Sequence, residues 1–153
     1  MKIRFATFNL FQFVEPPYSW YIRKDRFKIE QFEEKKTWIK EQIQNMNCDI
    51  IGFQEVFSKE CLKELLKSLG FNYFTTVDTA KTRNPNSKTY ISTTVALASK
   101  YPIKETKEID LYIPTLKKHN FEGHFRFSRK PINAIIELPN KQKIRVYYRS
   151  LIF

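Results

Sequence analysis

The sequence predicts an α/β fold in which two neighbouring parallel strands are joined by a helical crossover. The first observation is a nearly continuous apolar run at residues 50–53, typical of a strand buried on both faces. The second is an alternating pattern at residues 3–8, which indicates a strand with two different faces. The third is a helical apolar pattern at residues 25–47, long enough for the crossover that parallel pairing requires.

Polar side chains follow both of these predicted strands. Asn9 ends the first strand, and Gln54 and Glu55 end the second. If the strands pair in parallel, Asn9 and Glu55 meet at the same edge of one sheet. A carboxylate at such an edge suits Mg²⁺, which takes one or two protein carboxylates and keeps waters or substrate phosphates as its other ligands. Residues 54–55 considered alone favour an ordinary polar strand end over a metal site.

The segment between these strands predicts a loop followed by a helix. Residues 10–21 contain Pro16, Pro17 and several aromatic residues, which exclude a helix and favour an ordered loop beside the site. In the helix at residues 25–47, the apolar residues Phe32, Ile39, Ile43 and Met46 would face the core. Its charged residues, Lys35 among them, would cover the solvated side.

A second helix and several strands follow. Ser58 resembles an N-cap, an apolar stripe follows it, and Gly70 is placed as the residue just after the helix. Residues 71–77 predict a strand and residues 78–90 a polar surface loop. A core strand at residues 93–101 is halted by Pro102, and a further strand is predicted at residues 104–112.

The last third of the chain predicts a loop and a hairpin. His119 and His124 lie in or beside the loop at residues 114–123, and we interpret both as surface histidines. Residues 132–138 alternate as a strand, residues 139–142 form a turn, and residues 143–148 return as its partner.

Charge and composition limit the classes of partner. The 27 Lys and Arg residues exceed the 16 Asp and Glu residues, giving a formal charge of +11, which favours nucleic acid or an anionic membrane surface as a partner. A Lys-rich solubilising surface is the alternative. Cys48 and Cys61 have no metal-ligand spacing and are interpreted as core thiols. Lys2 and Arg4 interrupt any apolar leader, so we expect no signal peptide or transmembrane helix and a cytoplasmic location, with a secreted form left open.

Two short motifs, Phe8-Asn9-Leu10 and Asp49-Ile50-Ile51-Gly52-Phe53-Gln54-Glu55-Val56, occur in this order on either side of the amphipathic helix. Together they resemble the endonuclease/exonuclease/phosphatase superfamily, which includes deoxyribonuclease I and exonuclease III. The resemblance implies a four-layer α/β sandwich of two sheets flanked by helices. It also implies that Asn9 is a site asparagine and that Glu55 binds Mg²⁺, with Mn²⁺ as an alternative. The segment Phe127-Ser128-Arg129-Lys130-Pro131 is similar to the deoxyribonuclease I pattern, which implies that Arg129 contacts a substrate phosphate.

The resemblance covers only the first part of the family domain. Arg149 stands at or near the position of the family's catalytic histidine, and the later Gly-Asp-x-Asn and Asp-His motifs do not occur. We therefore expect residues 1–153 to be a partial, truncated domain with negligible activity alone, because a base that prepares water is missing. We also expect the first sheet to leave an apolar face uncovered.

These observations favour a lineage of metal-dependent phosphohydrolases. The lineage reaction would be Mg²⁺-assisted hydrolysis of a phosphodiester, with nucleic acid as the preferred substrate. A phospholipid or inositol-phosphate hydrolase lineage is one alternative, since one fold serves both. A non-catalytic polyanion-binding module is the other.

Overall fold

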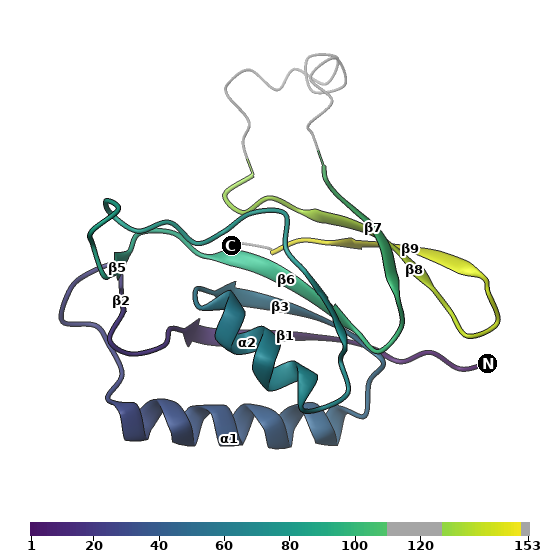
Figure 1. Cartoon of the computed structure of the whole chain (residues 1–153), viewed down its shortest axis with the longest axis horizontal. Helices are drawn as coiled ribbons and strands as arrows, with labels where there is room; N and C mark the ends of the chain where they lie inside the picture. Colours follow the sequence, from purple (N-terminus) through teal and green to yellow (C-terminus); the bar gives the residue numbers. More distant parts are fainter. Residues whose placement is uncertain (110–126, 151–153) are drawn as a thin grey trace, which may run out of the picture.

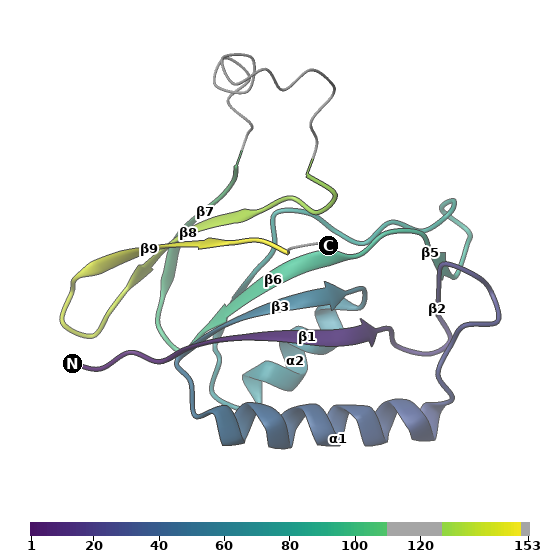
Figure 2. The ribbon, with the colours of Figure 1, turned by 180° about the vertical axis from the view of Figure 1, so that it is seen from behind.

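The computed structural model describes residues 1–109 and 127–150, and in these residues the chain is a mixed α/β protein (Figures 1 and 2). His119, His124 and the predicted loop at residues 114–123 lie outside the described residues. The elements, in chain order, are β1 (Phe5–Phe13), β2 (Ser19–Trp20), α1 (Ile29–Met46), β3 (Ile50–Val56), α2 (Lys59–Lys67), β4 (Tyr73–Thr75), β5 (Thr89–Tyr90), β6 (Thr94–Ser99), β7 (Ile103–Glu108), β8 (Ile132–Glu137) and β9 (Lys143–Tyr148).

The first sheet has the strand order β1-β3-β6-β4 and carries the candidate site. Strands β1 and β3 pair in parallel, with Phe5 opposite Ile50, so the predicted crossover arrangement is confirmed. Strand β6 is antiparallel to both β3 and β4. The first four residues of β3 form an apolar run that is buried throughout, as expected for a strand covered on both faces.

Helices α1 and α2 lie on one face of this sheet (Figures 1 and 2). Phe32, Ile39 and Ile43 of α1 are buried there, together with three leucines of α2, because both helices repeat apolar residues at helical spacing. Helix α1 begins at Ile29, four residues after the predicted start. Met46, expected to face the core, is partly exposed at the last turn.

A second sheet, β7-β8-β9, covers part of the opposite face of the first. Three buried residues of β8 (Ile132, Ala134 and Ile136) pack with buried residues of β3 and β6 in one apolar cluster. The expectation of an uncovered apolar face is therefore wrong for β3 and β6, because the predicted hairpin folds back over them. The corresponding side of β1 remains open, and Phe5 is 57% exposed.

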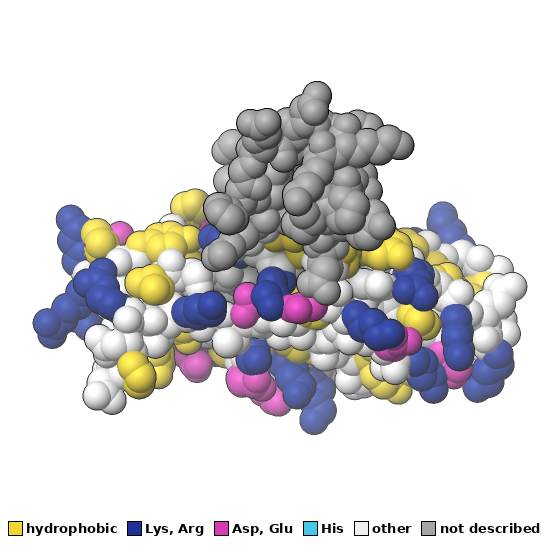
Figure 3. Space-filling model, turned by 90° about the horizontal axis from the view of Figure 1, so that it is seen from above, with side chains coloured by type: hydrophobic (Ala, Val, Ile, Leu, Met, Phe, Trp, Pro, Cys, Tyr) yellow, Lys and Arg dark blue, Asp and Glu magenta, His cyan; other side chains and the backbone are white. Residues whose placement is uncertain are grey.

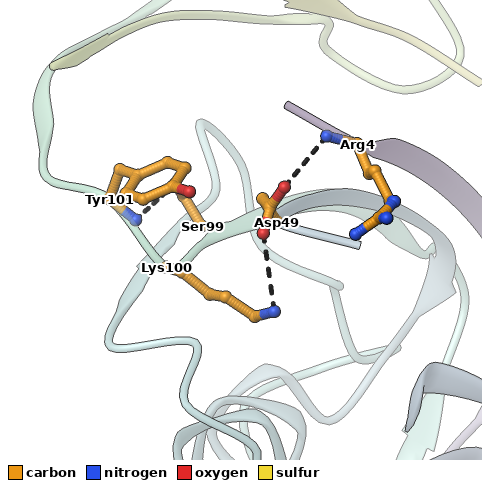
Figure 4. Close-up of polar contacts among 5 residues, drawn as sticks. All are labelled: Arg4, Asp49, Ser99, Lys100 and Tyr101. Atoms are coloured by element: carbon orange, nitrogen blue, oxygen red, sulfur yellow. Dashed lines mark hydrogen bonds and ion pairs between the residues drawn. The ribbon is translucent and has the colours of Figure 1, made fainter. Parts of the chain in front are cut away.

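The amino-terminal ends of β1 and β3 are joined by a polar cluster (Figure 4). The Asp49 carboxylate accepts a hydrogen bond from the Arg4 backbone N–H at 2.9 Å and lies 3.6 Å from Lys100 Nζ. The buried Ser99 Oγ accepts a hydrogen bond from the Tyr101 N–H at 2.9 Å, which shapes the turn between β6 and β7. Asp49 belongs to a motif that carries the family resemblance, and here its carboxylate joins the start of β1 to Lys100.

The carboxyl-terminal ends of β1 and β3 lie at the opposite end of the molecule, beside β2 and β5 (Figures 1 and 2). Strands β2 and β5 pair in parallel and join two long connections that the sequence predicts as loops. The rings of Tyr18 and Tyr90 stack there, with centroids 5.2 Å apart. In the described part of the chain, no helix combines the length and apolar character that crossing a bilayer requires.

Candidate functional site

Asn9 and Glu55 meet where the regular pairing of β1 with β3 is interrupted. The predicted strand end at Asn9 is wrong, because β1 continues to Phe13 and so includes the first residues of the predicted loop. The register places Asn9 opposite Gln54, and the Asn9 side-chain Nδ2 donates a hydrogen bond to Glu55 Oε1 at 3.3 Å. Both side chains thus lie at one edge of the first sheet, as predicted. They come from strands that a helix separates in sequence, and the parallel pairing of these strands brings the two residues to the same end of the sheet.

A double irregularity in the strands turns Glu55 toward β1. Between the pairs Asn9/Gln54 and Phe13/Val56, β1 has three residues where β3 has only Glu55. Backbone φ angles are positive at Phe11 (48°), Gln12 (62°) and Glu55 (58°). Such conformations cost on the order of 1–3 kcal/mol each for residues with a Cβ, so packing and hydrogen bonds around the site must hold them.

The Glu55 carboxylate is held by a donor on each oxygen. Glu55 Oε2 accepts the backbone N–H of Gln12 at 2.9 Å, while Oε1 receives the Asn9 amide. Asn9 Oδ1 accepts the Phe11 N–H at 2.9 Å, which fixes the amide orientation, because the flipped amide would turn its oxygen toward the carboxylate. The positive φ at Gln12 therefore accompanies an N–H that points at the carboxylate.

Lys35 approaches this site from α1. Its Nζ donates a hydrogen bond to the Phe11 carbonyl oxygen at 2.7 Å and lies 5.1 Å from the centroid of the Phe27 ring. Burial lowers the pKa of the Lys35 ammonium, and the Glu55 carboxylate opposes that shift. The prediction that Lys35 simply faces solvent is wrong, because the bulged end of β1 folds over the first turns of the helix.

Tyr148 lies on the face of β1 and β3 that is opposite to α1. The sequence pattern predicts no role for it. Its Oη is 2.9 Å from Thr7 Oγ1, and its ring lies directly over Gly52, which has no side chain to keep it away. Burial raises the pKa of the Tyr148 phenol, although hydrogen bonds to Thr7 and Gln54 oppose the shift. A glycine in the middle of a buried strand was the signal that another group approaches the backbone there.

Arg129 is not brought into contact with the Asn9–Glu55 pair. It lies just before β8, half-exposed, and its Nη1 donates a hydrogen bond to the neighbouring Ser128 carbonyl oxygen at 2.8 Å. Its assignment to a substrate phosphate stays a prediction. Arg149, which stands at or near the position where the family has its catalytic histidine, directly follows the end of β9.

A single carboxylate with its oxygens facing a strand edge fits a Mg²⁺ ion that keeps most of its waters. Each carboxylate oxygen has a second lone pair beyond the hydrogen bond that it accepts. Within residues 1–109 and 127–150, no group of three or more His, Cys, Asp and Glu side chains is placed to hold a metal by protein ligands alone.

No protein-family model matches the chain, and no curated protein matches it.

Proposed function

We propose that the chain belongs to a lineage of metal-dependent phosphohydrolases, in which Glu55 binds Mg²⁺ and the site accepts a phosphodiester. The single observation that carries this proposal is the Asn9–Glu55 hydrogen bond, formed where the regular pairing of the parallel strands β1 and β3 is interrupted. A carboxylate that is oriented by an amide and a backbone N–H is prepared for an ion before the ion arrives. That preparation favours binding, because the ligand loses little further freedom.

Each residue of the site has a distinct part in this proposal. Glu55 would hold the ion, and Asn9 would keep the carboxylate in position while offering its second amide hydrogen to a phosphate oxygen. Mg²⁺ supplies polarisation of the phosphoryl group and stabilisation of the leaving oxygen when it is bound. Lys35 fixes the Phe11 carbonyl oxygen and so holds the backbone that presents the Gln12 N–H.

We assign binding of the metal and of the phosphodiester to this chain, and expect negligible hydrolysis by the chain alone. No residue is assigned as the base that prepares water. Nucleic acid is the preferred substrate class, which the formal charge of +11 supports.

The superfamily's four-layer sandwich is the architecture that we propose for the domain. The packing of β8 on β3 and β6 supports it, since β7-β8-β9 then forms part of the second sheet. The exposed row on β1, formed by Phe5, Thr7 and Asn9, is the surface that an extended second sheet would face.

Thermal unfolding in a Mg²⁺ titration tests the proposal. An ion that binds only the folded chain raises Tm in proportion to the logarithm of its concentration once it exceeds Kd. We expect this rise in the wild type and its loss in Glu55→Gln, which keeps the shape and a hydrogen-bond acceptor but removes the charge.

Glu41→Gln is the matched control, because Glu41 lies on the exposed side of α1 and the substitution removes the same charge. It should respond to Mg²⁺ as the wild type does. An equal Mg²⁺ response in Glu55→Gln would exclude Glu55 as the ligand and with it the proposed site.

A further inference from the structure

A cavity of about 530 Å³ lies beside the start of α1 and is lined by cations. Its wall contains Lys24, Arg26 and Lys28, with Phe27, Ile29 and two prolines between them, and it contains no carboxylate. None of the ion pairs in the described part of the chain involves these three side chains. The cavity is therefore a concentration of positive charge with no acidic wall residue to balance it.

An anion is the ligand that such a wall selects. Three like charges around one cavity repel one another, and a phosphate between them would replace this repulsion by attraction. The cavity also adjoins the amino-terminal end of the 18-residue helix α1, where the helix dipole is positive. Figure 3 shows Lys and Arg side chains along the whole visible face, at the end that carries β2 and β5 as well as at the opposite end.

Contacts of Lys35 link the cavity wall to the Asn9–Glu55 site. Phe27 of the cavity wall lies under Lys35 Nζ, and the same ammonium group is bonded to the Phe11 carbonyl oxygen. The residue after Phe11 supplies the N–H that holds Glu55. The ends of β1 and β3 and the start of α1 also lie at the same end of the molecule (Figures 1 and 2).

Lys35 also lies beside an exposed aromatic ring. The Phe11 side chain is 67% exposed although it is large and apolar, and Lys35 Nζ lies 5.6 Å from its ring centroid. Aromatic rings beside a basic groove are the feature on which unpaired bases stack. A free phosphate or a lipid headgroup would use the cations but has no base to place on Phe11.

We propose that the cavity formed by Lys24, Arg26 and Lys28 binds a backbone phosphate of a single-stranded polynucleotide, with a base on Phe11 and a neighbouring phosphodiester at Glu55. This inference rests on the proposed function for the placement at Glu55. It specifies the substrate as a strand with consecutive phosphates and unpaired bases.

Fluorescence anisotropy with a short labelled oligothymidylate, in EDTA and over a series of salt concentrations, tests the cavity. The variant Lys24→Gln/Arg26→Gln/Lys28→Gln should bind at least tenfold more weakly than the wild type. The slope of log K against log salt should fall by about 0.7, the contribution of one phosphate contact on a single strand, since the cavity binds one backbone phosphate. Phe11→Ala should weaken binding and leave the salt slope unchanged, because the ring carries no charge.

Lys2→Gln/Lys63→Gln/Lys67→Gln is the control, since it removes the same formal charge from exposed lysines outside the cavity wall. An equal loss of affinity in both triple variants would overturn the proposal in favour of non-specific attraction. A second contrary result is that the wild type binds vesicles of anionic phospholipid as tightly as it binds the oligothymidylate, with the cavity variant losing the vesicle binding. That result would overturn the proposal in favour of a lipid surface.

In EDTA, Glu55→Gln should bind the oligonucleotide more tightly than the wild type, because without an ion the Glu55 carboxylate repels the neighbouring phosphodiester. The effect of added Mg²⁺ then separates the two hypotheses. If the oligonucleotide binds through the cavity but Mg²⁺ has no Glu55-dependent effect, the proposed function fails and the phosphate-binding cavity stands. If Mg²⁺ acts through Glu55 and the cavity variant binds normally, the cavity assignment alone fails.

Discussion

Single side chains at the end of β1 and β3 are held by backbone groups as much as by one another. Glu55 receives one donor from a side chain and one from the main chain, and Asn9 is itself fixed by the Phe11 N–H. Asn9 and Glu55 were predictable, because each polar residue ends an apolar run. Lys35 and Gln12 were not, since their roles follow from a strand irregularity that no local sequence pattern announces.

Cys61 is the residue whose ionisation gives the clearest pH prediction. Burial raises the pKa of its thiol to about 11, with Glu15 adding to the shift and Lys36 opposing it. The folded chain therefore keeps this proton above the pH at which the unfolded chain loses it, normally near 9.0. The free energy of unfolding should fall as pH rises from 9 toward 11.

Urea unfolding of the wild type and Cys61→Ala at pH values across this window measures the effect. The raised pKa values of Cys48, Tyr90 and Tyr148 act in both proteins, so the difference between the two isolates Cys61. The wild type should lose more stability than Cys61→Ala on the way from neutral to alkaline pH. Parallel pH profiles would show that the thiol is not protected by the fold.

One contact between the two sheets depends on a residue without a side chain, Gly52. Gly52 in β3 leaves room for the Tyr148 ring of β9, and so links the first sheet to the second. A Cβ at position 52 would lie 2.2 Å from the nearest ring atom, far inside contact distance. Because that position is in a buried strand, the ring would have to leave its place.

Gly52→Ala should therefore lower the free energy of unfolding by about 1–3 kcal/mol, the usual cost of overpacking a core. In a Tyr148→Leu background the same substitution should cost less, because the clashing ring is gone. The comparison is a double-mutant cycle in urea. Additive effects of the two substitutions would show that the ring does not lie on Gly52.

At the level of helices and strands, the sequence predicts most of the elements that form the core. The buried strand β3, helix α2 and the hairpin β8–β9 follow from apolar periodicity, and Ser58 does precede α2. Its side chain, however, accepts the Glu15 N–H instead of capping the helix. The short strands β2 and β5 lie in segments that the sequence predicts as loops, since two-residue pairings between distant segments leave no periodic pattern.

The whole molecule is organised by two apolar clusters on the two faces of the first sheet. One lies under α1 and α2, and the other lies between the first sheet and β7-β8-β9. The second cluster was not expected, because alternation in a predicted hairpin shows that one face is apolar without showing what covers it. A sheet that carries an apolar cluster on each of its two faces should unfold as one cooperative unit with the elements packed on it.

Ala134→Asp tests this packing, because Ala134 is completely buried between the sheets. A carboxylate there has no partner and should shift the urea midpoint strongly downward or prevent folding. Asn133→Asp is the control on the same strand, since Asn133 is half-exposed and already accepts a hydrogen bond from Arg145. Similar effects of the two substitutions would contradict the packing of β8 on the first sheet.

The central claim, that Asn9 and Glu55 form a divalent-cation site, is tested most directly by NMR with a trace of Mn²⁺. The paramagnetic ion should selectively broaden the Asn9 side-chain NH₂ signals and the Gln12 backbone amide, because both groups contact the Glu55 carboxylate. The same signals should stay sharp in Glu55→Gln, while excess Mg²⁺ should restore them in the wild type. Broadening confined to other parts of the chain, or unchanged in Glu55→Gln, would contradict the account.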